Sequence, residues 1–191
     1  MEIGILDLQG SVIEHTTVLT NCGIKPVPVK YPRDLEGLSG LILPGGESTT
    51  IAELLLRSGL FKIIKDKAES GMPVYGTCAG LILMAKRIID GTKNQPSLEL
   101  MNITARRNAY GRQNESFEED IEIPVLGKKP FPGIFIRAPL IVDVGKKVEI
   151  LGKHNGSIIA AREGNFLVST FHPELTDDIR FHRYFISMCD G

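Results

Sequence analysis

The chain has 191 residues, of which 42% are hydrophobic and 24% are charged. This composition is typical of a globular protein and excludes an intrinsically disordered or fibrous one. The net charge of −1 provides no positive field for unspecific binding to nucleic acid or anionic lipid. The length suits one domain over residues 1–191, which needs no disulfide bond to be stable.

No apolar run approaches the roughly 20 residues that cross a bilayer, and the N-terminus lacks the basic start of a signal peptide. We therefore expect a cytoplasmic protein. The three cysteines are odd in number and form no Cys-x-x-Cys pair, which argues against a disulfide framework or a zinc ribbon. The four histidines form no His-Glu-x-x-His motif, so nothing indicates a metal site or a cofactor.

Short apolar runs alternate with helix-length segments in the N-terminal half of the chain. We predict strands at 3–6, 27–30, 41–43 and 73–75, and helices at 12–19, after residue 50 and at 81–89. The strand at 27–30 contains a proline, which favours a position near a sheet edge. Thr50 and Glu53 have the spacing of a capping box at the start of the second helix. The alternation predicts a parallel sheet with helices on both faces.

The pattern changes after about residue 91. Strand-like segments follow one another, and a helix closes the chain; we place them at 100–106, 116–123, 133–138, 148–151, 157–160, 166–171 and, for the helix, 177–189. Asn155-Gly156 separates two apolar runs, which is a strong hairpin signal. We therefore expect an α/β fold with three α/β/α layers, a mostly parallel central sheet and antiparallel additions in the C-terminal half.

Cys78 lies in the segment 76–80, Gly-Thr-Cys-Ala-Gly, between a predicted strand and a predicted helix. This spacing is that of a nucleophile elbow, a turn so tight that side chains at the two glycine positions would collide with backbone. A helix that starts behind a cysteine favours the thiolate, and the N–H of Ala79 is a candidate donor to an oxyanion. The alternative is a buried structural cysteine, which is how we interpret Cys22 and Cys189.

His172 and Glu174 follow the apolar run at 166–171 and flank Pro173. Alternate residues of an extended segment point to one side, and the proline keeps the segment extended. Glu174 is thus predicted to orient His172, which acts as the base for Cys78. A lone His-x-Glu is more simply a surface pair, but its occurrence together with a cysteine elbow favours a catalytic triad. The remaining histidines are assigned no role: His15, His154 and His182.

Gly45 and Gly46 follow Pro44 at the end of the strand predicted at 41–43. Adjacent glycines permit an unusual backbone path and a close approach to a ligand. The N–H of Gly46 is our candidate for a second oxyanion donor. One alternative is a phosphate-binding loop, although the lysine of a Walker motif is absent. Another is a helix-capping turn, which explains Ser48 and Thr50 but not the two glycines.

Together these segments resemble the class I, triad-type glutamine amidotransferases, in which a Pro-Gly-Gly loop, a Gly-x-Cys-x-Gly elbow and a His-Pro-Glu segment occur in this order. Finer motifs are similar to those of the glutaminase subunits of pyridoxal 5′-phosphate synthases, and they lie at 8–10, 44–50, 76–82, 107–113, 135–139 and 171–175. The resemblance covers nearly the whole chain. One departure is Asp7, where we expect a small residue before Leu-Gln-Gly. This departure puts the contacts of this segment with a partner subunit in doubt and leaves the triad untouched.

The resemblance implies a flavodoxin-like fold and hydrolysis of L-glutamine to L-glutamate and ammonia through a glutamyl thioester. It also implies a hetero-oligomer with a (β/α)8-barrel synthase subunit, which receives the ammonia through a tunnel and builds pyridoxal 5′-phosphate. The glutaminase is then nearly idle until it docks, and Gln9 and Gly10 lie near the site and the interface. By the same resemblance, the glutamine pocket is lined by Gly46, Glu47, Ser48, Arg107, Ile136 and Arg137.

Two of these residues also carry chemical expectations. The guanidinium of Arg107 suits the α-carboxylate of glutamine because it pairs with it bidentately. Taken alone, however, Arg107 is a surface charge beside Arg106. We expect the N–H of Gly46 to be poorly aimed in the isolated subunit, because two adjacent glycines make a peptide flip inexpensive. Docking then realigns it, with Gln9-Gly10 as the relay.

Three other functions compete with this one. The chain could feed a different synthase, such as the imidazole glycerol phosphate one; only the resemblance of 107–113 argues against it. It could be a non-catalytic scaffold subunit on the same fold, against which the intact Cys78, His172 and Glu174 argue. A cysteine peptidase or esterase is the third, and it predicts acyl or peptide turnover without a partner.

Overall fold

The computed structural model describes residues 1–91, 95–107 and 116–190. The segment 107–113, singled out in the sequence, lies outside the described residues except for Arg107. Over the described part, no helix is both long enough and apolar enough to cross a membrane.

The helices and short 3-10 turns are α1 (Val12–Asn21), η1 (Pro32–Leu35), α2 (Ser48–Arg57), α3 (Leu60–Glu69), α4 (Ala79–Met84), η2 (Pro124–Leu126), η3 (Pro173–Leu175) and α5 (Arg180–Cys189). The strands are β1 (Glu2–Leu6), β2 (Lys25–Val29), β3 (Gly40–Leu43), β4 (Val74–Thr77), β5 (Ala85–Ile89), β6 (Met101–Arg106), β7 (Ser116–Ile121), β8 (Phe131–Ile136), β9 (Leu140–Val144), β10 (Glu149–His154), β11 (Ser157–Glu163) and β12 (Phe166–Ser169).

The central sheet has ten strands in the order β2-β1-β3-β4-β12-β11-β9-β6-β5, with β10 paired to β11. Strands β2, β1, β3, β4 and β12 run parallel to one another. Strand β2 lies at the edge, as its prolines at 26 and 28 require, because proline cannot donate to a strand on both sides. The predicted parallel sheet is therefore confirmed.

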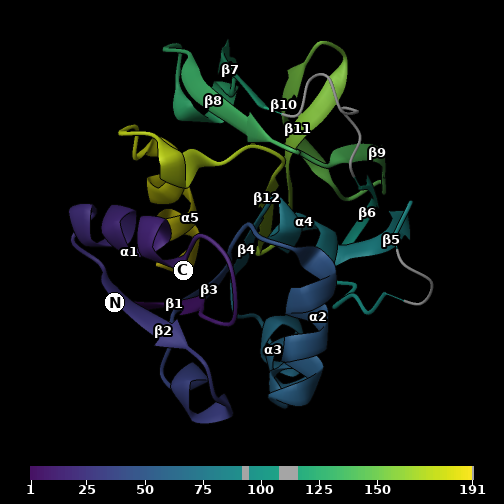
Figure 1. Cartoon of the computed structure of the whole chain (residues 1–191). Helices are drawn as coiled ribbons and strands as arrows, with labels where there is room; N and C mark the ends of the chain where they lie inside the picture. The colour runs from purple at the N-terminus through teal and green to yellow at the C-terminus, as the bar shows by residue number, and fades with distance from the viewer. Residues whose placement is uncertain (92–94, 108–115, 191) are drawn as a thin grey trace.

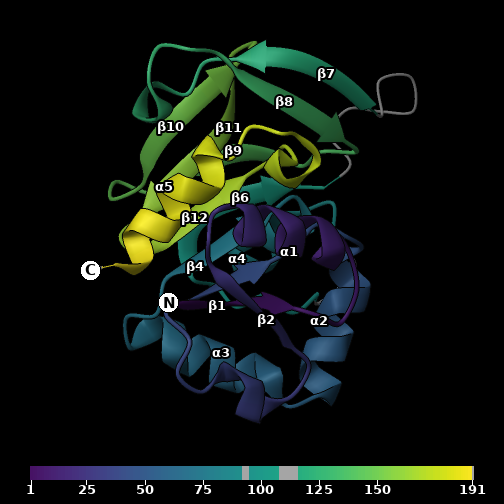
Figure 2. The same cartoon turned by 90° about the vertical axis from the view of Figure 1, so that its left-hand side faces the viewer.

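Helices cover both faces of this parallel part (Figures 1 and 2). Leu41 and Leu43 of β3 belong to a buried apolar cluster with residues of α2, α3 and α4. Ile42, between them, points the other way and packs with Phe181 and Phe185 of α5 and with Leu19 of α1. Side chains alternate along a strand, so one short run contributes to both layers of core. The three-layer α/β/α arrangement is confirmed.

The C-terminal half adds antiparallel strands, also as predicted. Strand β11 runs antiparallel to β12, β9 and β10, and β9 is antiparallel to β6. The turn between β10 and β11 has positive φ at both Asn155 and Gly156, 48° and 81°, which is the backbone that an Asn-Gly hairpin turn requires. Strands β7 and β8 form a separate two-stranded sheet above the central one (Figure 1).

The helix predicted at 81–89 is wrong in its second half. Helix α4 ends at Met84, and residues 85–89 form strand β5, which pairs with β6 in parallel. Pairing with β6 decides this segment, and its β-branched Ile88 and Ile89 suit a strand. Strand β9 and helix α3 were not foreseen.

The capping box predicted at Thr50 and Glu53 is also wrong. Helix α2 begins three residues earlier than predicted, at Ser48, and Glu47 is its N-cap. The Glu47 carboxylate accepts the N–H of Thr50 at 2.8 Å. A carboxylate at this position satisfies a free N–H of the first turn and suits the positive end of the helix dipole.

Candidate active site

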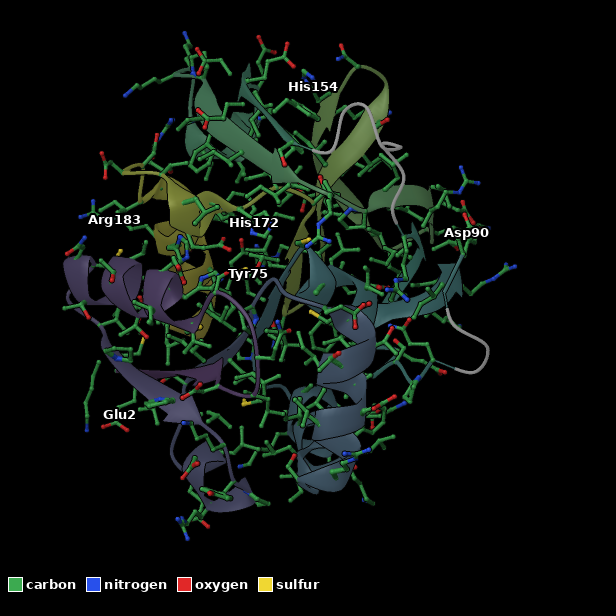
Figure 3. All side chains as sticks on the ribbon, viewed as in Figure 1. Glu2, Tyr75, Asp90, His154, His172 and Arg183 are labelled. Carbon is green, nitrogen blue, oxygen red and sulfur yellow. The ribbon has the colours of Figure 1, made fainter. Side chains whose placement is uncertain are left out.

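Four loops meet at one edge of the sheet because they follow adjacent parallel strands. They come after β1, β3, β4 and β12, which are neighbours in the sheet. In an open α/β sheet, this carboxyl edge is where ligands bind. The loops carry Gln9, Gly46, Cys78 and His172, so residues far apart in the sequence are brought together. Figure 3 shows His172 near the centre of the molecule.

The cysteine turn has the strained backbone of an elbow. Cys78 has φ 49° and ψ −100°, and its N–H donates to the Ser169 carbonyl of β12 at 2.9 Å. A Cβ at Gly76 would lie 2.6 Å from the carbonyl carbon of Gly80, and one at Gly80 would lie 2.0 Å from the Leu43 oxygen. Side chains at Gly76 and Gly80 would therefore collide with backbone, as expected from the sequence. Helix α4 starts at Ala79, two residues before the predicted start at 81 and directly behind Cys78.

The structure brings Cys78, His172 and Glu174 together in the expected order. Nδ1 of His172 lies 2.7 Å from Oε1 of Glu174, and His172 and Cys78 line the same cavity. The backbone N–H of His172 donates to the Ile134 carbonyl of β8 at 2.8 Å, which fixes the segment after β12. His172 and Glu174 are 6% and 5% exposed, so the alternative of a surface pair is excluded.

The proton in this pair lies on His172 at neutral pH. Burial opposes a charge on the imidazole, but hydrogen bonds with Cys78 and Glu174 outweigh it and raise the pKa of His172 from 6.5 to about 10. Burial also opposes a charge on Glu174, yet His15 and the hydrogen-bonded His172 lower the pKa of Glu174 from 4.5 to about 2. The two groups form a buried, charge-assisted hydrogen bond.

Gly45 and Gly46 are required by close approach and not by an unusual φ. Neither has a positive φ. A Cβ at Gly45 would lie 2.5 Å from Cε1 of His172, and one at Gly46 would lie 2.4 Å from Oε1 of Gln9. The two glycines thus admit the His172 imidazole on one side and the Gln9 side chain on the other.

The segment before α1 holds this glycine loop. The Gln9 side chain accepts the N–H of Glu47 at 2.9 Å, and the N–H of Ser11 donates to the Gly45 carbonyl at 3.1 Å. Gly10 has φ 112°, and a Cβ there would lie 1.8 Å from the same carbonyl oxygen. Gln9 and Gly10 therefore contact the loop expected to form the oxyanion hole. Nearby Asp7 pairs with Lys30 at 3.1 Å.

One cavity of about 410 Å³ is lined by Cys78 and by every residue expected in the pocket. Glu174 lies behind His172 and does not line it. The residues predicted from the sequence that do line it are Gln9, Gly10, Gly46, Glu47, Ser48, Cys78, Ala79, Arg107, Ile136, Arg137 and His172. Gly45 also lines the cavity, as do four residues that were not predicted to line it: Ser11, Glu14, Ile82 and Leu175, the last two within the motifs at 76–82 and 171–175. A larger groove of about 1010 Å³ beside β7 and β8 contains none of the predicted site residues.

Arg107 is a cavity residue, so its interpretation as a surface charge is wrong. Its side chain is 14% exposed and donates to Oε1 of Glu47 at 2.7 Å. It also donates to Thr49 and Gln95, both at 3.0 Å. Arg106 points to the surface instead, where it pairs with Asp90 at 3.6 Å. Successive residues at a strand end face opposite ways, which separates the two arginines.

The other two thiols differ from Cys78 in their surroundings. Burial raises the pKa of Cys22, and burial together with Asp190 raises the pKa of Cys189 to about 12. Both therefore stay protonated and unreactive at neutral pH. No cluster of three or more His, Cys, Asp or Glu side chains that could hold a metal ion occurs among the described residues.

Comparisons with known proteins agree with this geometry. The chain is 51% identical to the pyridoxal 5′-phosphate synthase subunit PdxT of Pelotomaculum thermopropionicum over 99% of this chain and 95% of that one. It is 53% identical to PdxT of Geobacillus thermodenitrificans over 98% and 95%. A crystal structure of a glutamine amidotransferase, 44% identical, superposes with a TM-score of 0.93 over 99% of both chains. The sequence pattern of the SNO glutamine amidotransferase family matches residues 5–191. The chain belongs to the SNO glutamine amidotransferase family.

Proposed function

We propose that the chain hydrolyses L-glutamine to L-glutamate and ammonia, with Cys78 as nucleophile, His172 as acid and base, and Glu174 as the group that orients His172. The observation that carries the proposal is one cavity lined by both a Cys–His pair and an Arg–Glu pair. The first suits attack on an amide, and the second suits the zwitterionic end of an amino acid. A continuous ten-stranded sheet supports residues 1–191 as one glutaminase domain.

The thiolate of Cys78 attacks the side-chain amide carbon of glutamine, and the C–N bond then breaks. The proton on His172 goes to the departing ammonia, which leaves a glutamyl thioester. The raised pKa of His172 supports this role, because the imidazole already holds the proton when glutamine binds. Neutral His172 next takes a proton from water, and the resulting hydroxide cleaves the thioester to glutamate and the Cys78 thiolate, while the proton of the new carboxyl group leaves on ammonia as ammonium. The thiolate and the protonated His172 are thus restored.

The head group of glutamine is recognised by Arg107 and Glu47. A guanidinium binds the α-carboxylate through paired N–H donors, and a carboxylate accepts from the α-ammonium. In the structure these two side chains pair with each other at 2.7 Å, so the site holds both charges ready without a substrate. Ser48, Ile136 and Arg137 line the rest of the pocket.

The N–H groups of Ala79 and Gly46 stabilise the oxyanion. The Gly45 carbonyl accepts from Ser11, and C=O and N–H of a trans peptide point in opposite directions. Turning this peptide to re-aim the Gly46 N–H therefore breaks the bond to Ser11. We infer that a docked partner compensates for that loss through Gln9 and Gly10, which contact the same loop.

That partner is a (β/α)8-barrel synthase subunit that takes the ammonia through a tunnel and builds pyridoxal 5′-phosphate. The proposal is supported by relatives about 50% identical that are named subunits of this synthase. We also place the protein in the cytoplasm, since three free cysteines, one of them the proposed nucleophile, suit a reducing compartment.

Ammonia release from glutamine, measured with and without the barrel subunit, tests the proposal. We expect slow release by the isolated chain and a large rise on adding the barrel. Turnover of peptides or esters in place of glutamine would support the peptidase or esterase alternative. Binding to the barrel without any ammonia release would support a scaffold subunit.

A further inference from the structure

A group of buried polar side chains lies directly behind Glu174 and takes no part in the steps above. His15 from α1, His182 from α5 and Thr77 from β4 are each 0% exposed. Nδ1 of His15 is 3.0 Å from Nε2 of His182, and Nε2 of His15 is 3.3 Å from the Thr77 hydroxyl. The same Nε2 lies 3.6 Å from Oε2 of Glu174, the oxygen that has no hydrogen bond within the described part of the chain. Buried polar groups are normally paired, so the cluster requires a reason.

Both imidazoles of this cluster are neutral at neutral pH. Tyr75 packs edge-on against His15 and His182, with ring centroids 6.3 and 6.1 Å apart. In this enclosed environment the pKa of His15 is lowered: burial and the positive charge of His172 together outweigh the attraction of Glu174 and Glu14. Burial and the neighbouring His15 lower the pKa of His182 to about 3. Each ring therefore has one N–H and one lone pair.

The surroundings decide which nitrogen of each ring carries its proton. A lone pair on Nε2 of His15 would face the negative charge of Glu174, so the proton belongs on Nε2. Nδ1 of His15 then accepts from the Nε2–H of His182. This leaves a lone pair on Nδ1 of His182, the atom without a partner among the described residues. The reverse arrangement would leave a buried N–H unpaired at that atom, which is rarer in proteins than an unpaired acceptor.

We propose that His15 is a positioning residue of the triad: its Nε2–H, which also lies 3.3 Å from the Thr77 hydroxyl, faces the second carboxylate oxygen of Glu174 while His172 holds the first. This inference rests on the proposed function. The separation of 3.6 Å is longer than a hydrogen bond, so the contact is an attraction between a charge and an N–H dipole. In a buried site such an attraction is little screened by water. It prevents the carboxylate from rotating away from His172.

The location of His15 supports a role at the site rather than in the core alone. It lies one helical turn beyond Ser11, which holds the Gly45 carbonyl, and it contacts Thr77, which directly precedes Cys78. One imidazole thus contacts the strand of the nucleophile and the carboxylate of the triad. Its own orientation is fixed by His182 from a third element.

Three substitutions of His15 separate its Nε2 donor from its bulk. His15→Gln places an amide N–H near the position of Nε2. His15→Asn reaches only as far as Nδ1, so it retains a polar group for His182 but no donor for Glu174. His15→Leu removes both. Thermal unfolding measures the stability of each variant, and alkylation of Cys78 counts the folded sites.

The decisive measurement is the titration of the His172 ring by nitrogen NMR in the full-length chain, assigned with His172→Asn. In the wild type we expect His172 to titrate with a pKa of about 10. In His15→Asn and His15→Leu the His172 ring should titrate at lower pH, because the freed Glu174 carboxylate stabilises the imidazolium less well. His15→Gln should restore the wild-type titration of His172. An unchanged titration in His15→Asn, or an equal fall in all three variants, would overturn the proposal.

Ammonia release in the complex with the barrel subunit gives the second measurement. We expect kcat per folded site to fall about 10- to 100-fold in His15→Asn with KM unchanged, and to recover in His15→Gln. A rise in KM at unchanged kcat would contradict a positioning role. If the wild type releases no ammonia, the proposed function fails, and the NMR titration still decides the role of His15.

Discussion

The two oxygens of Glu174 face two groups of histidines whose pKa values are shifted in opposite directions. On the cavity side, which comprises Cys78 and His172, the pKa of the imidazole is raised to about 10. On the core side, which comprises His15 and His182, burial lowers both pKa values, that of His182 to about 3. All three imidazoles are buried, so burial alone does not explain the difference.

Direct contact explains it. His172 donates to Glu174 at 2.7 Å, whereas His15 lies 3.6 Å from the other carboxylate oxygen and His182 reaches the carboxylate only through His15. A short hydrogen bond to an anion repays the cost of burying a charge, and a distant anion does not. The cavity side can therefore move a proton during catalysis, while the core side keeps its protons fixed.

Removal of the nucleophile should give the largest effect and leave the core side intact. We expect Cys78→Ala to abolish glutamine hydrolysis, because no other thiol lines the cavity. The variant should still fold and still bind the barrel subunit. Measurable turnover by Cys78→Ala in the complex would contradict the nucleophile assignment. Cys22→Ala, which changes a thiol outside the cavity, is the matched control.

Replacing His172, which carries the mobile proton of the cavity side, should give the second largest effect. We expect His172→Asn to lower kcat by at least about 10²–10⁴-fold, the usual contribution of a positioned acid and base, and by more because the triad acts as a unit. Glu174→Gln should cost less, since it weakens the orientation of His172 without removing the imidazole. His154→Asn changes a histidine near β7 and should leave kcat unaltered. Near-normal turnover by His172→Asn would exclude the triad.

The glycine loop connects the cavity to α1, and Gly46→Ala tests that connection. The added Cβ would lie 2.4 Å from Oε1 of Gln9, so the Gln9 side chain must leave its bond to Glu47. We expect the rise in ammonia release on docking to shrink by about 10²–10³-fold, the effect of one oxyanion donor. Gln9→Ala, which removes the same bond without crowding the loop, should show a smaller loss in the same direction. A wild-type response in Gly46→Ala would exclude this coupling route.

The pH dependence of stability gives the smallest effect. Because the pKa of Glu174 is about 2 in the folded chain and 4.5 when unfolded, its contribution is complete above pH 4.5 and is lost as pH falls through 2. Because the pKa of His172 is raised from 6.5 to about 10, its contribution is complete below pH 6.5 and is lost as pH rises through 10.

We therefore expect the free energy of unfolding of Glu174→Gln to change less with pH than that of the wild type in both windows. Urea unfolding at several pH values measures this. Glu119→Gln, which removes an exposed partner of His154, should retain the wild-type pH dependence. Parallel curves for wild type and Glu174→Gln would show that the buried pair does not exist in solution.

The cavity side could be predicted from the sequence because its signals are local. The glycines around Cys78 constrain the backbone at the residue itself. Pro173 instead begins the 3-10 turn η3, so the expectation that residues 172–174 stay extended is wrong, although Nδ1 of His172 does lie 2.7 Å from Oε1 of Glu174. The alternation of strands and helices then brings the loops to one sheet edge. Arg107 was placed in the pocket only by resemblance, since nothing in its neighbourhood distinguishes it from Arg106.

The rest depends on contacts between distant segments. Residues 85–89 continue a helical pattern but pair with β6. The start of helix α2 is the exception, because its N-cap is local: Glu47, and not Thr50, caps it. The core side was missed because its contacts also join distant segments: His15 and His182 are 167 positions apart, and each alone is a histidine in a helix. The sequence feature that came closest to indicating this pair is a histidine on the otherwise apolar face of each helix.

The central claim is that Cys78, activated beside His172, attacks the amide carbon of bound glutamine. The most direct test is to treat the chain, in complex with the barrel subunit, with a chloroketone analogue of glutamine and to locate the label by peptide mass spectrometry. We predict modification of Cys78 alone, prevented by excess glutamine, since Cys22 and Cys189 have raised pKa values. Labelling at Cys22 or Cys189 while Cys78 stays free, or labelling that glutamine does not prevent, would contradict the claim.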